Sequence, residues 1–308
     1  MTNLLHILLF PGLLFLLVGG GFLSWFDRKI TAWVQFRKGP PMLQPLYDFV
    51  KLMSKETILP RNASRMTFLS APIFSAAGAA IAGLLILLPA FGVSGGFRGD
   101  LIVIFYVLAI PSLTYIMGAM ASGNPLASLG ASREMKLIIA YELSFLLIIA
   151  AIILKAGFSL EIAGIMAAQQ SGVAFIGSIS GVLLFIALLM CLQAKLGFVP
   201  FDAAEAETEI ASGFLIEYSG PPLAFIKLSK YILIIVLPVL AAVLLLGGFH
   251  LEGWGILWAV LKILLVVLLI TLVRNTNPRL TIKHAMKFFF IWMNLLVVVA
   301  IVLHYFGL

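Results

Sequence analysis

Long apolar runs separated by short polar loops constrain the fold of this chain more than any other feature. A helix of about 20 apolar residues spans the hydrocarbon core of a bilayer, and about eight windows of that length occur. The windows are 4–25, 68–90, 101–121, 136–154, 173–194, 222–246, 254–273 and 287–306. The sequence therefore predicts an all-α, polytopic integral membrane protein in which residues 1–308 form a single transmembrane domain.

The composition excludes several other classes of protein. The chain is 62% hydrophobic and 11% charged, whereas soluble domains are about 45–50% apolar and about 25% charged. Its net charge of +7 does not indicate nucleic-acid binding, because the basic residues cluster beside the apolar windows. The lone cysteine, Cys191, excludes an internal disulfide and a cluster held by four cysteines of this chain. The first window lacks a small-residue cleavage site and is expected to be a retained helix rather than a signal peptide.

The distribution of basic residues predicts the orientation. The loop 26–67 carries eight of them: Arg28, Lys29, Arg37, Lys38, Lys51, Lys55, Arg61 and Arg65. The loop 274–287 carries Arg274, Arg279, Lys283 and Lys287, but the alternate loops 91–100 and 155–172 contain only Arg98 and Lys155. The positive-inside rule places the first, third, fifth and seventh loops in the cytoplasm. We therefore expect a plasma-membrane protein with both termini on the outer side.

Part of the first loop has helical spacing. Its apolar positions are Leu43, Leu46, Tyr47 and Val50, flanked by Lys51 and Lys55. This pattern is typical of an amphipathic helix that lies at the cytoplasmic membrane interface. A helix that packs against a partner subunit explains the pattern equally well.

The fifth loop contains an unusual concentration of acidic residues. Five of the thirteen acids of the chain lie there: Asp202, Glu205, Glu207, Glu209 and Glu217. Pro200 and Gly213 bracket an expected helix of about three turns, in which Asp202 and Glu205 have the spacing of a capping box.

On such a helix Asp202, Glu205 and Glu209 share one face. Because like charges crowd there beside the membrane, at least one carboxyl should have a raised pKa. The alternative is an ordinary solvated loop.

A few charged residues fall inside the apolar windows. Glu142 and Lys262 lie too deep to reach water easily, so we expect them to belong to a polar path or to contact a charged neighbour. Lys227 and Lys230 lie near the start of the sixth window. Lysines at such positions often extend their side chains to the membrane surface, so a purely structural role is as expected for them as a functional one.

Motifs of soluble enzymes are absent from the sequence. It contains no phosphate-binding glycine loop that opens a helix, no histidine pair at zinc spacing and no nucleophile elbow. We expect no catalytic, cofactor-binding or metal site on this chain alone.

Several motifs in unbroken order resemble the subunit that seats quinone at the heel of respiratory complex I. The first loop has Asp27-Arg28-Lys29, then Arg37 and Gly39-Pro40. Further matches are Gly130-Ala131 with Arg133 and Tyr141-Glu142, the acidic Pro200-Phe201-Asp202 stretch through Glu209, Glu217-Tyr218-Ser219-Gly220, and Pro278-Arg279. The resemblance covers residues 27–290.

Within this superfamily the chain is most similar to the equivalent subunit of energy-converting, membrane-bound nickel–iron hydrogenases. Complex I members usually have an arginine where this chain has Phe198, and an asparagine where it has Pro41. The segments Gly130–Glu134 and Asn275–Leu280 resemble the hydrogenase group more closely. A similar subunit occurs in a ferredoxin-dependent sulfane reductase.

The resemblance implies a non-catalytic membrane subunit of a redox-driven pump that oxidises ferredoxin, reduces protons and moves H⁺ or Na⁺. The nickel–iron site and iron–sulfur clusters are expected in hydrogenase-like large and small partner subunits, with antiporter-like membrane subunits alongside. Loops 26–67 and 196–221 would contact this hydrophilic arm.

The resemblance also implies roles for individual residues. The five loop acids with Glu142 and Lys262 would form the coupling path, and Arg37, Arg133 and Arg279 would contact the arm or anchor the acidic loop. The alternatives are a quinone-linked oxidoreductase, a sulfane reductase, a stand-alone secondary transporter and a purely structural anchor.

Overall fold

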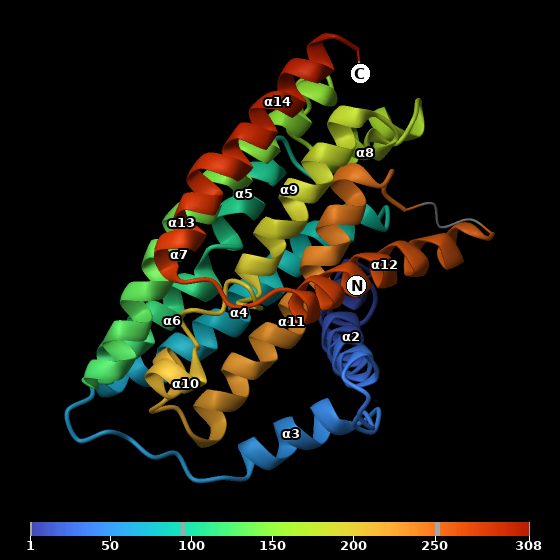
Figure 1. Ribbon diagram of the computed structural model, residues 1–308. Coiled ribbons are helices and arrows are strands. Elements are labelled where there is room, and N and C mark those ends of the chain that lie inside the picture. Colours follow the sequence, from blue (N-terminus) through green and yellow to red (C-terminus); the bar gives the residue numbers. More distant parts are fainter. Residues whose placement is uncertain (1, 94–95, 250–252, 308) are drawn as a thin grey trace.

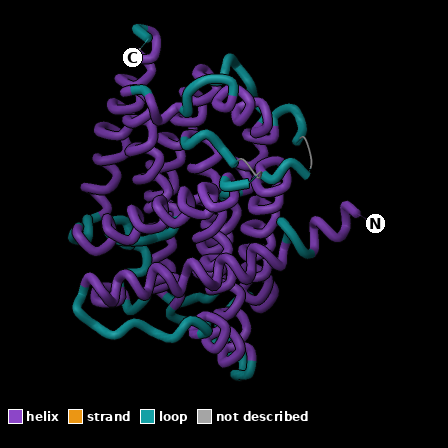
Figure 2. The backbone as a smooth tube through the Cα atoms, turned by 90° about the vertical axis from the view of Figure 1, so that its right-hand side faces the viewer, coloured by secondary structure: helices purple, strands orange, loops and turns teal. Residues whose placement is uncertain are grey.

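The chain folds into a bundle of long helices. A computed structural model describes residues 2–93, 96–249 and 253–307, and the regular structure of these segments is helical without strands (Figures 1 and 2). The helices that cross the bundle or border it are α1 (Thr2–Leu8), α2 (Leu13–Val34), α3 (Gln44–Met53), α4 (Arg65–Ala90), α5 (Asp100–Val107), α6 (Ile110–Ala121), α7 (Pro125–Lys155), α8 (Ile162–Gln170), α9 (Ile179–Lys195), α11 (Gly220–Leu245), α12 (Gly255–Thr276), α13 (Ile282–Lys287) and α14 (Asn294–Tyr305). The shorter elements are η1 (Phe175–Gly177), α10 (Glu207–Ile210), η2 (Gly213–Leu215) and the π-helical turn η3 (Phe288–Met293).

The described helices confirm the predicted all-α, polytopic architecture. The described residues contain seven spans that are long and apolar enough to cross a membrane, and α9 is a shorter apolar helix. Three of the seven, Leu5–Val34, Asp100–Ala121 and Ile282–Tyr305, each join consecutive helices. Three predicted boundaries differ by more than five residues: α2 ends at Val34 rather than 25, α7 begins at Pro125 rather than 136, and α9 begins at Ile179 rather than 173. The early start of α7 follows from Asn124, whose side chain accepts a hydrogen bond from the Leu126 amide, and from a proline at the first helical position.

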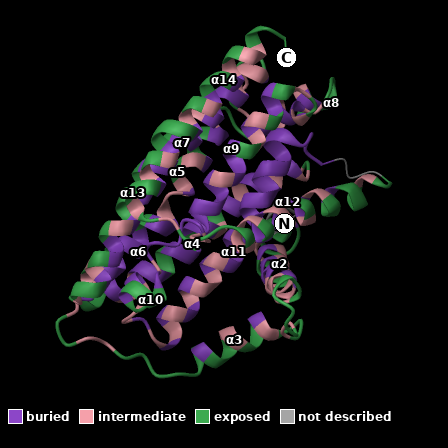
Figure 3. Cartoon of the chain, viewed as in Figure 1, coloured by how far each residue is buried: buried purple, intermediate pink, exposed green. Residues whose placement is uncertain are grey.

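The central helix of the bundle is α11. Of its most apolar window 89% is buried, and it packs against α2, α4, α9 and α12. Figure 3 shows the resulting contrast between the buried α11 and the exposed outer sides of α3 and α12. Side chains carried by α11 can therefore reach several neighbouring helices.

Four loops meet at one end of the bundle, which we call the acidic end. The Ser64 amide donates to the Ala121 carbonyl at 2.9 Å, and the Leu280 amide donates to the Pro200 carbonyl at 3.0 Å. The α2–α4 and α9–α11 loops are joined by a hydrogen bond from the Ile58 amide to Ser219 Oγ at 3.2 Å. These contacts bring together the loops that the charge pattern placed on one side.

The alternate loops lie at the opposite end. There the rings of Phe10 and Phe249 each contact Phe91, with centroids 5.3 and 5.7 Å apart. The C-terminal end of α14 also lies away from α10 (Figure 1). Phe10 near the start of the chain and the C-terminal end of α14 thus both lie away from the acidic end.

The predicted amphipathic helix of the first loop is present as α3. It packs against α2 and α11 through buried Pro45 and Leu52. Three of its other apolar residues, Leu46, Tyr47 and Val50, are each more than half exposed, at 55%, 55% and 57%. An apolar face of α3 therefore remains open at the edge of the bundle.

The close packing of α2 on α11 makes a prediction about Gly20. A Cβ atom at Gly20 would lie 2.1 Å from the backbone oxygen of Tyr231, whereas one at Gly21 would meet nothing within 4 Å. We expect Gly20→Ala to lower the free energy of unfolding by about 1–3 kcal/mol, the usual range for an overpacked core. Thermal unfolding of the purified protein in detergent measures the effect, with Gly21→Ala as the matched control. Equal midpoints for the two variants would contradict the packing described here.

Candidate functional site

The acidic loop, residues 196–219, is not the three-turn helix that its sequence predicts. Only Glu207–Ile210 forms an α-helical turn, followed by the short η2, and residues 202–206 form turns whose alanines are buried. The predicted capping box is absent because α10 begins after Ala206, which makes no side-chain cap. Asp202, Glu205 and Glu209 therefore do not share a helical face.

Each of these three acids pairs with a cation from a different part of the chain. Asp202 Oδ2 lies 2.7 Å from Arg279 Nε, in the α12–α13 connection. Glu205 pairs with Lys230 of α11. The remaining pair joins Glu209 Oε2 to Nη1 of Arg133 on α7 at 2.6 Å. The acidic loop is thus tied electrostatically to three separate segments.

The other two acids of the loop lie apart from these pairs. Glu217 Oε1 accepts a hydrogen bond from Asn124 Nδ2 at 2.5 Å, next to the start of α7. Glu207 is exposed. Arg37 is exposed too, beyond the end of α2, and in the described part of the chain no hydrogen bond or ion pair joins it to the acidic loop.

Glu142 has the charged neighbour that its depth predicts. Its Oε1 lies 2.5 Å from Lys195 Nζ, and the two side chains are only 14% and 4% exposed. The ammonium also lies over the rings of Tyr141 and Phe145, 5.3 and 4.8 Å from their centroids. A buried pair of this kind is costly to break, because one charge is then left without a partner.

Lys262 is not brought near Glu142. Its Nζ donates to the Gly248 carbonyl at 2.8 Å, just beyond the end of α11 and away from the acidic end. The structure therefore places Lys262 as the partner of a backbone carbonyl, whereas Lys230 is the lysine that reaches the acidic loop.

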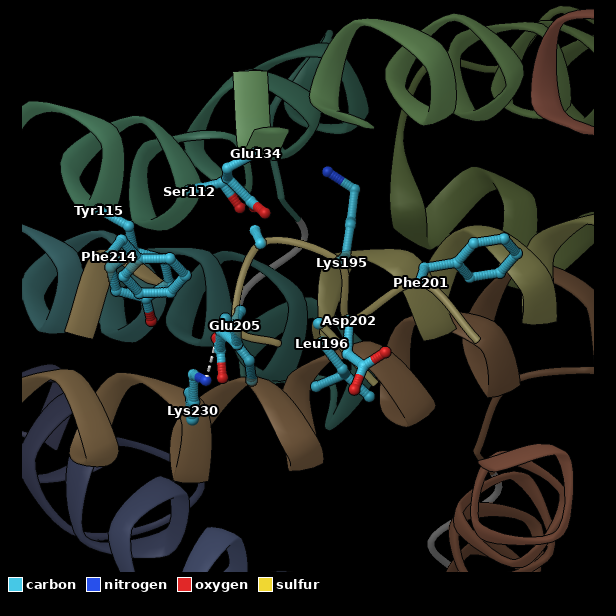
Figure 4. A pocket seen from close by; sticks show the side chains of 13 residues that line it. Ser112, Tyr115, Glu134, Lys195, Leu196, Phe201, Asp202, Glu205, Phe214 and Lys230 are labelled. Atoms are coloured by element: carbon cyan, nitrogen blue, oxygen red, sulfur yellow. Dashed lines mark hydrogen bonds and ion pairs between the residues drawn. The ribbon is translucent and has the colours of Figure 1, made fainter. Parts of the chain in front are cut away.

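A narrow cavity of about 10 Å³ lies beneath the acidic loop. Figure 4 shows its charged lining: Glu134, Lys195, Asp202, Glu205 and Lys230. Such a volume is close to the minimum that holds one water molecule, about 10–15 Å³. The cavity therefore brings several ionisable groups from α7, α9, α11 and the loop around a space of water size.

A second cavity of about 280 Å³ lies on the other side of the Glu205–Lys230 pair, which lines both. Its other polar walls are Ser24, Asp27, Arg28, Lys227, Tyr231 and Arg274. Asp27 Oδ2 lies 2.8 Å from Arg274 Nη1, so α2 and α12 are joined here by a further interhelical pair. The Glu205–Lys230 pair separates two polar spaces within the bundle.

A third, apolar cavity of about 390 Å³ lies between α2, α3 and α11. Its walls include Leu17, Phe22, Leu46 and Phe49, and it shares Tyr231 with the second cavity. The Tyr231 hydroxyl accepts from Arg28 Nη2 at 3.1 Å, and Arg28 Nη1 lies 2.9 Å from Asp48. The hydrogen-bonded Tyr231, Arg28 and Asp48 thus lie between the apolar third cavity and the charged second cavity.

Two carboxyl groups of this region have pKa values shifted in opposite directions. Burial raises the pKa of Asp202, an effect that Arg279 only partly offsets. The expected raised pKa is therefore found, but its main cause is desolvation rather than crowding with other acids. At Asp48 burial acts to raise the pKa, but hydrogen bonds from Arg28 and Gln44 outweigh it and hold the pKa below its usual value.

Glu134 and Lys195 were not among the residues predicted from the sequence to form the site. Glu134 lay outside the window 136–154, although it is seven residues before Tyr141 and so lies on the same helical face. Extending the helix back to Pro125 would have identified it. The pairing of Lys195 with Glu142 depends on how α9 packs against α7, which no local pattern indicates.

The described residues contain no group of three or more histidine, cysteine or acidic side chains that could hold a metal ion. The arrangement instead consists of paired charges, hydroxyls and small polar cavities. Such a constellation can store and exchange protons.

Comparisons with known proteins place this geometry in context. Residues 6–305 match the family model described as NADH dehydrogenase. The chain is 35% identical over 280 residues to a subunit of the NADH-quinone oxidoreductase of Rhodospirillum rubrum, covering 86% of this chain and 82% of the relative. It is 36% identical over 284 residues to the equivalent protein of Thermomicrobium roseum, covering 84% and 82%.

Among solved structures, a chain in the membrane-bound sulfane sulfur reductase, an archaeal respiratory membrane complex, has a similar fold. The TM-score is 0.88 at 26% sequence identity, covering 98% of this chain and 99% of that one. The similarity therefore extends over essentially the whole fold.

The opposite pKa shifts predict opposite dependences of stability on pH. The lowered pKa of Asp48 stabilises the fold above the ordinary carboxyl value of 3.8, and this contribution is lost as the pH falls. The raised pKa of Asp202 disfavours the folded state as the pH rises through and above 3.8.

We expect Asp48→Asn to be less stable than wild type at neutral pH, with the difference closing at acidic pH. Asp202→Asn should be at least as stable as wild type at neutral pH. Unfolding midpoints across pH test both, and the same pH trend in the two variants would contradict the assignment.

Proposed function

The chain belongs to the NADH dehydrogenase family and is a membrane subunit of a complex I-like oxidoreductase, and on that premise we propose that it couples electron transfer in a hydrophilic arm to ion movement in neighbouring membrane subunits. The observation that supports this proposal best is the set of ion pairs joining the acidic loop to α7, α11 and the α12–α13 connection. A change of charge at the outer face of the loop alters all three pairs together. The three pairs would therefore respond as a set rather than one by one.

Glu142 and Lys195 would extend this coupling into the bundle. Their pair is buried, and Lys195 also lines the cavity beneath the acidic loop. A shift of Lys195 toward the cavity would leave Glu142 unpaired in a membrane helix, which is costly. The charge state of the cavity and that of Glu142 are therefore linked.

The acidic end would face the cytoplasm and bind the arm. Loops 26–67 and 196–221 lie there, and the exposed Arg37 is free to contact a partner. Arg133 and Arg279 hold the acidic loop in this chain, so their role is anchoring. In this proposal both termini lie outside in the plasma membrane, as the basic loops indicate.

We propose a hydrogenase-type arm, in which reduced ferredoxin supplies electrons and protons become hydrogen. The nickel–iron site and iron–sulfur clusters would lie in the large and small partner subunits, with antiporter-like subunits in the membrane. Supporting this choice, the position usually occupied by arginine in complex I members is Phe198, which packs 4.6 Å from the Arg274 guanidinium. The wall of the second cavity thus lacks that cation at this position.

A quinone-linked oxidoreductase is the second candidate, favoured by the apolar cavity between α2, α3 and α11. An isoprenoid tail suits such an entrance, and the charged second cavity behind Tyr231 suits a polar head group. The relatives named quinone oxidoreductases agree with this candidate. The structurally similar chain belongs to a sulfane sulfur reductase complex, so reduction of sulfane sulfur by the complex that contains this chain is a third possibility to test.

Removing a paired acid should uncouple the complex. We expect Glu209→Gln and Glu142→Gln to retain hydrogen evolution from an artificial donor, while the ions moved per electron fall about tenfold, within the usual range of coupling energies. Ion uptake into vesicles containing the intact complex measures the ratio. Glu207→Gln, in the same loop but exposed, is the control and should pump normally. Normal pumping in both paired-acid variants would disprove the role.

Purification of the intact complex tests the identity of the arm. We expect a gentle pull-down of this chain to recover nickel together with a hydrogenase-like large subunit. Recovery of iron–sulfur subunits without nickel would contradict the hydrogenase branch. Bound quinone or inhibitor sensitivity would then favour the second candidate.

A further inference from the structure

Glu134 is a buried acid in the cavity beneath the acidic loop. It lies on α7 and is 9% exposed. Gly130, one turn earlier on the same face, allows this approach, because a Cβ atom there would lie only 2.7 Å from the Phe214 amide nitrogen. The small residue lets the acidic loop rest directly on α7 and brings Glu134 against it.

The charge balance of the cavity leaves Glu134 without a counterion. Lys195 and Lys230 are paired with Glu142 and Glu205, and Asp202 is paired with Arg279. In the described part of the chain no cation lies within ion-pair distance of Glu134, which sits beside Ser112 (Figure 4). A buried carboxylate without a partner is unfavourable, so this carboxyl is the one best suited to hold a proton.

We propose that Glu134 is the proton-exchanging carboxyl of this cavity, and this inference rests on the coupling function proposed above. The protonated Glu134 gives its proton to the Glu205 carboxylate, directly or through one water in the cavity. Lys230, released from the now neutral Glu205, pairs with the new Glu134 carboxylate. One proton and one ion pair change places, and the net charge of the cavity stays constant.

This exchange explains why two lysines flank a single unpaired acid. Lys230 and Lys195 enter from α11 and α9, and the remaining polar neighbours are the hydroxyls of Ser112 and Tyr115 on α6. Because the cavity keeps its charge, the exchange avoids the main cost of moving a proton in a buried site. In the same exchange Glu205 gains a proton and loses its partner Lys230, and Glu205 also borders the second cavity.

Two substitutions separate proton exchange from a structural role. Glutamine keeps the size and hydrogen bonding of Glu134 but cannot titrate, whereas aspartate titrates but is shorter. We expect Glu134→Gln to lose ions moved per electron by about tenfold or more, as for loss of a positioned proton-transfer group. Glu134→Asp should retain most of the ratio. Electron transfer and subunit recovery of the intact complex serve as checks of assembly.

Each other outcome overturns the inference. Normal pumping by Glu134→Gln would show that its proton is not used, and loss in Glu134→Asp would show that size rather than titration matters. Lys230→Met in the same assay keeps the two proposals apart. If Lys230→Met pumps normally, the coupling function itself fails. If it does not pump but Glu134→Gln does, only the role of Glu134 fails.

Discussion

The structure depends on how carboxylates are neutralised where a loop enters a membrane bundle. Asp202, Glu205 and Glu209 each meet a cation from another segment, so the acidic loop is fixed by long-range pairs rather than by its own secondary structure. Burial alone would make the charges of Asp202 and Glu205 costly, and their pairing offsets part of that cost. The same contacts hold α7, α11 and the α12–α13 connection against the loop. Architecture and electrostatics at this end are therefore inseparable.

Because α11 lies at the centre of the bundle, a change in the pairing of Lys230 affects more than one part of the structure. Lys230 stands between two polar cavities, one reaching Glu134 and Lys195 and the other reaching Asp27 and Arg274. A change in the pairing of Lys230 therefore alters the charge distribution in both cavities. The buried Glu142–Lys195 pair lies one step further along the wall of the first cavity. An electrical event at the outer face of the loop can reach the interior through rearranged pairs, without a large movement of helices.

Hydropathy and charge were sufficient to predict the all-α bundle, because spanning a bilayer requires long apolar helices with satisfied backbones. The same reasoning placed α7 too late, since Arg133, Glu134 and Lys136 reduce the apolarity of its first turns although the helix continues through them. It also predicted a helix around Asp202 and Glu205, where tertiary pairing overrides local capping. The depth of Glu142 indicated a charged neighbour, but that this neighbour is Lys195 follows only from packing. Glu134 was not predicted because the expected helix began at residue 136, and its lack of a counterion is a property of the whole cavity.

Infrared difference spectroscopy of the intact complex in its membrane tests the central claim most directly. Reduction by the physiological donor should change the protonated-carboxyl bands if acids of this chain exchange protons during turnover. We expect bands that disappear in Glu205→Gln and persist in Glu207→Gln, because Glu205 is paired beside the cavity whereas Glu207 is exposed. Carboxyl bands identical in wild type and Glu205→Gln, or no carboxyl response to reduction, would contradict a coupling role for these pairs.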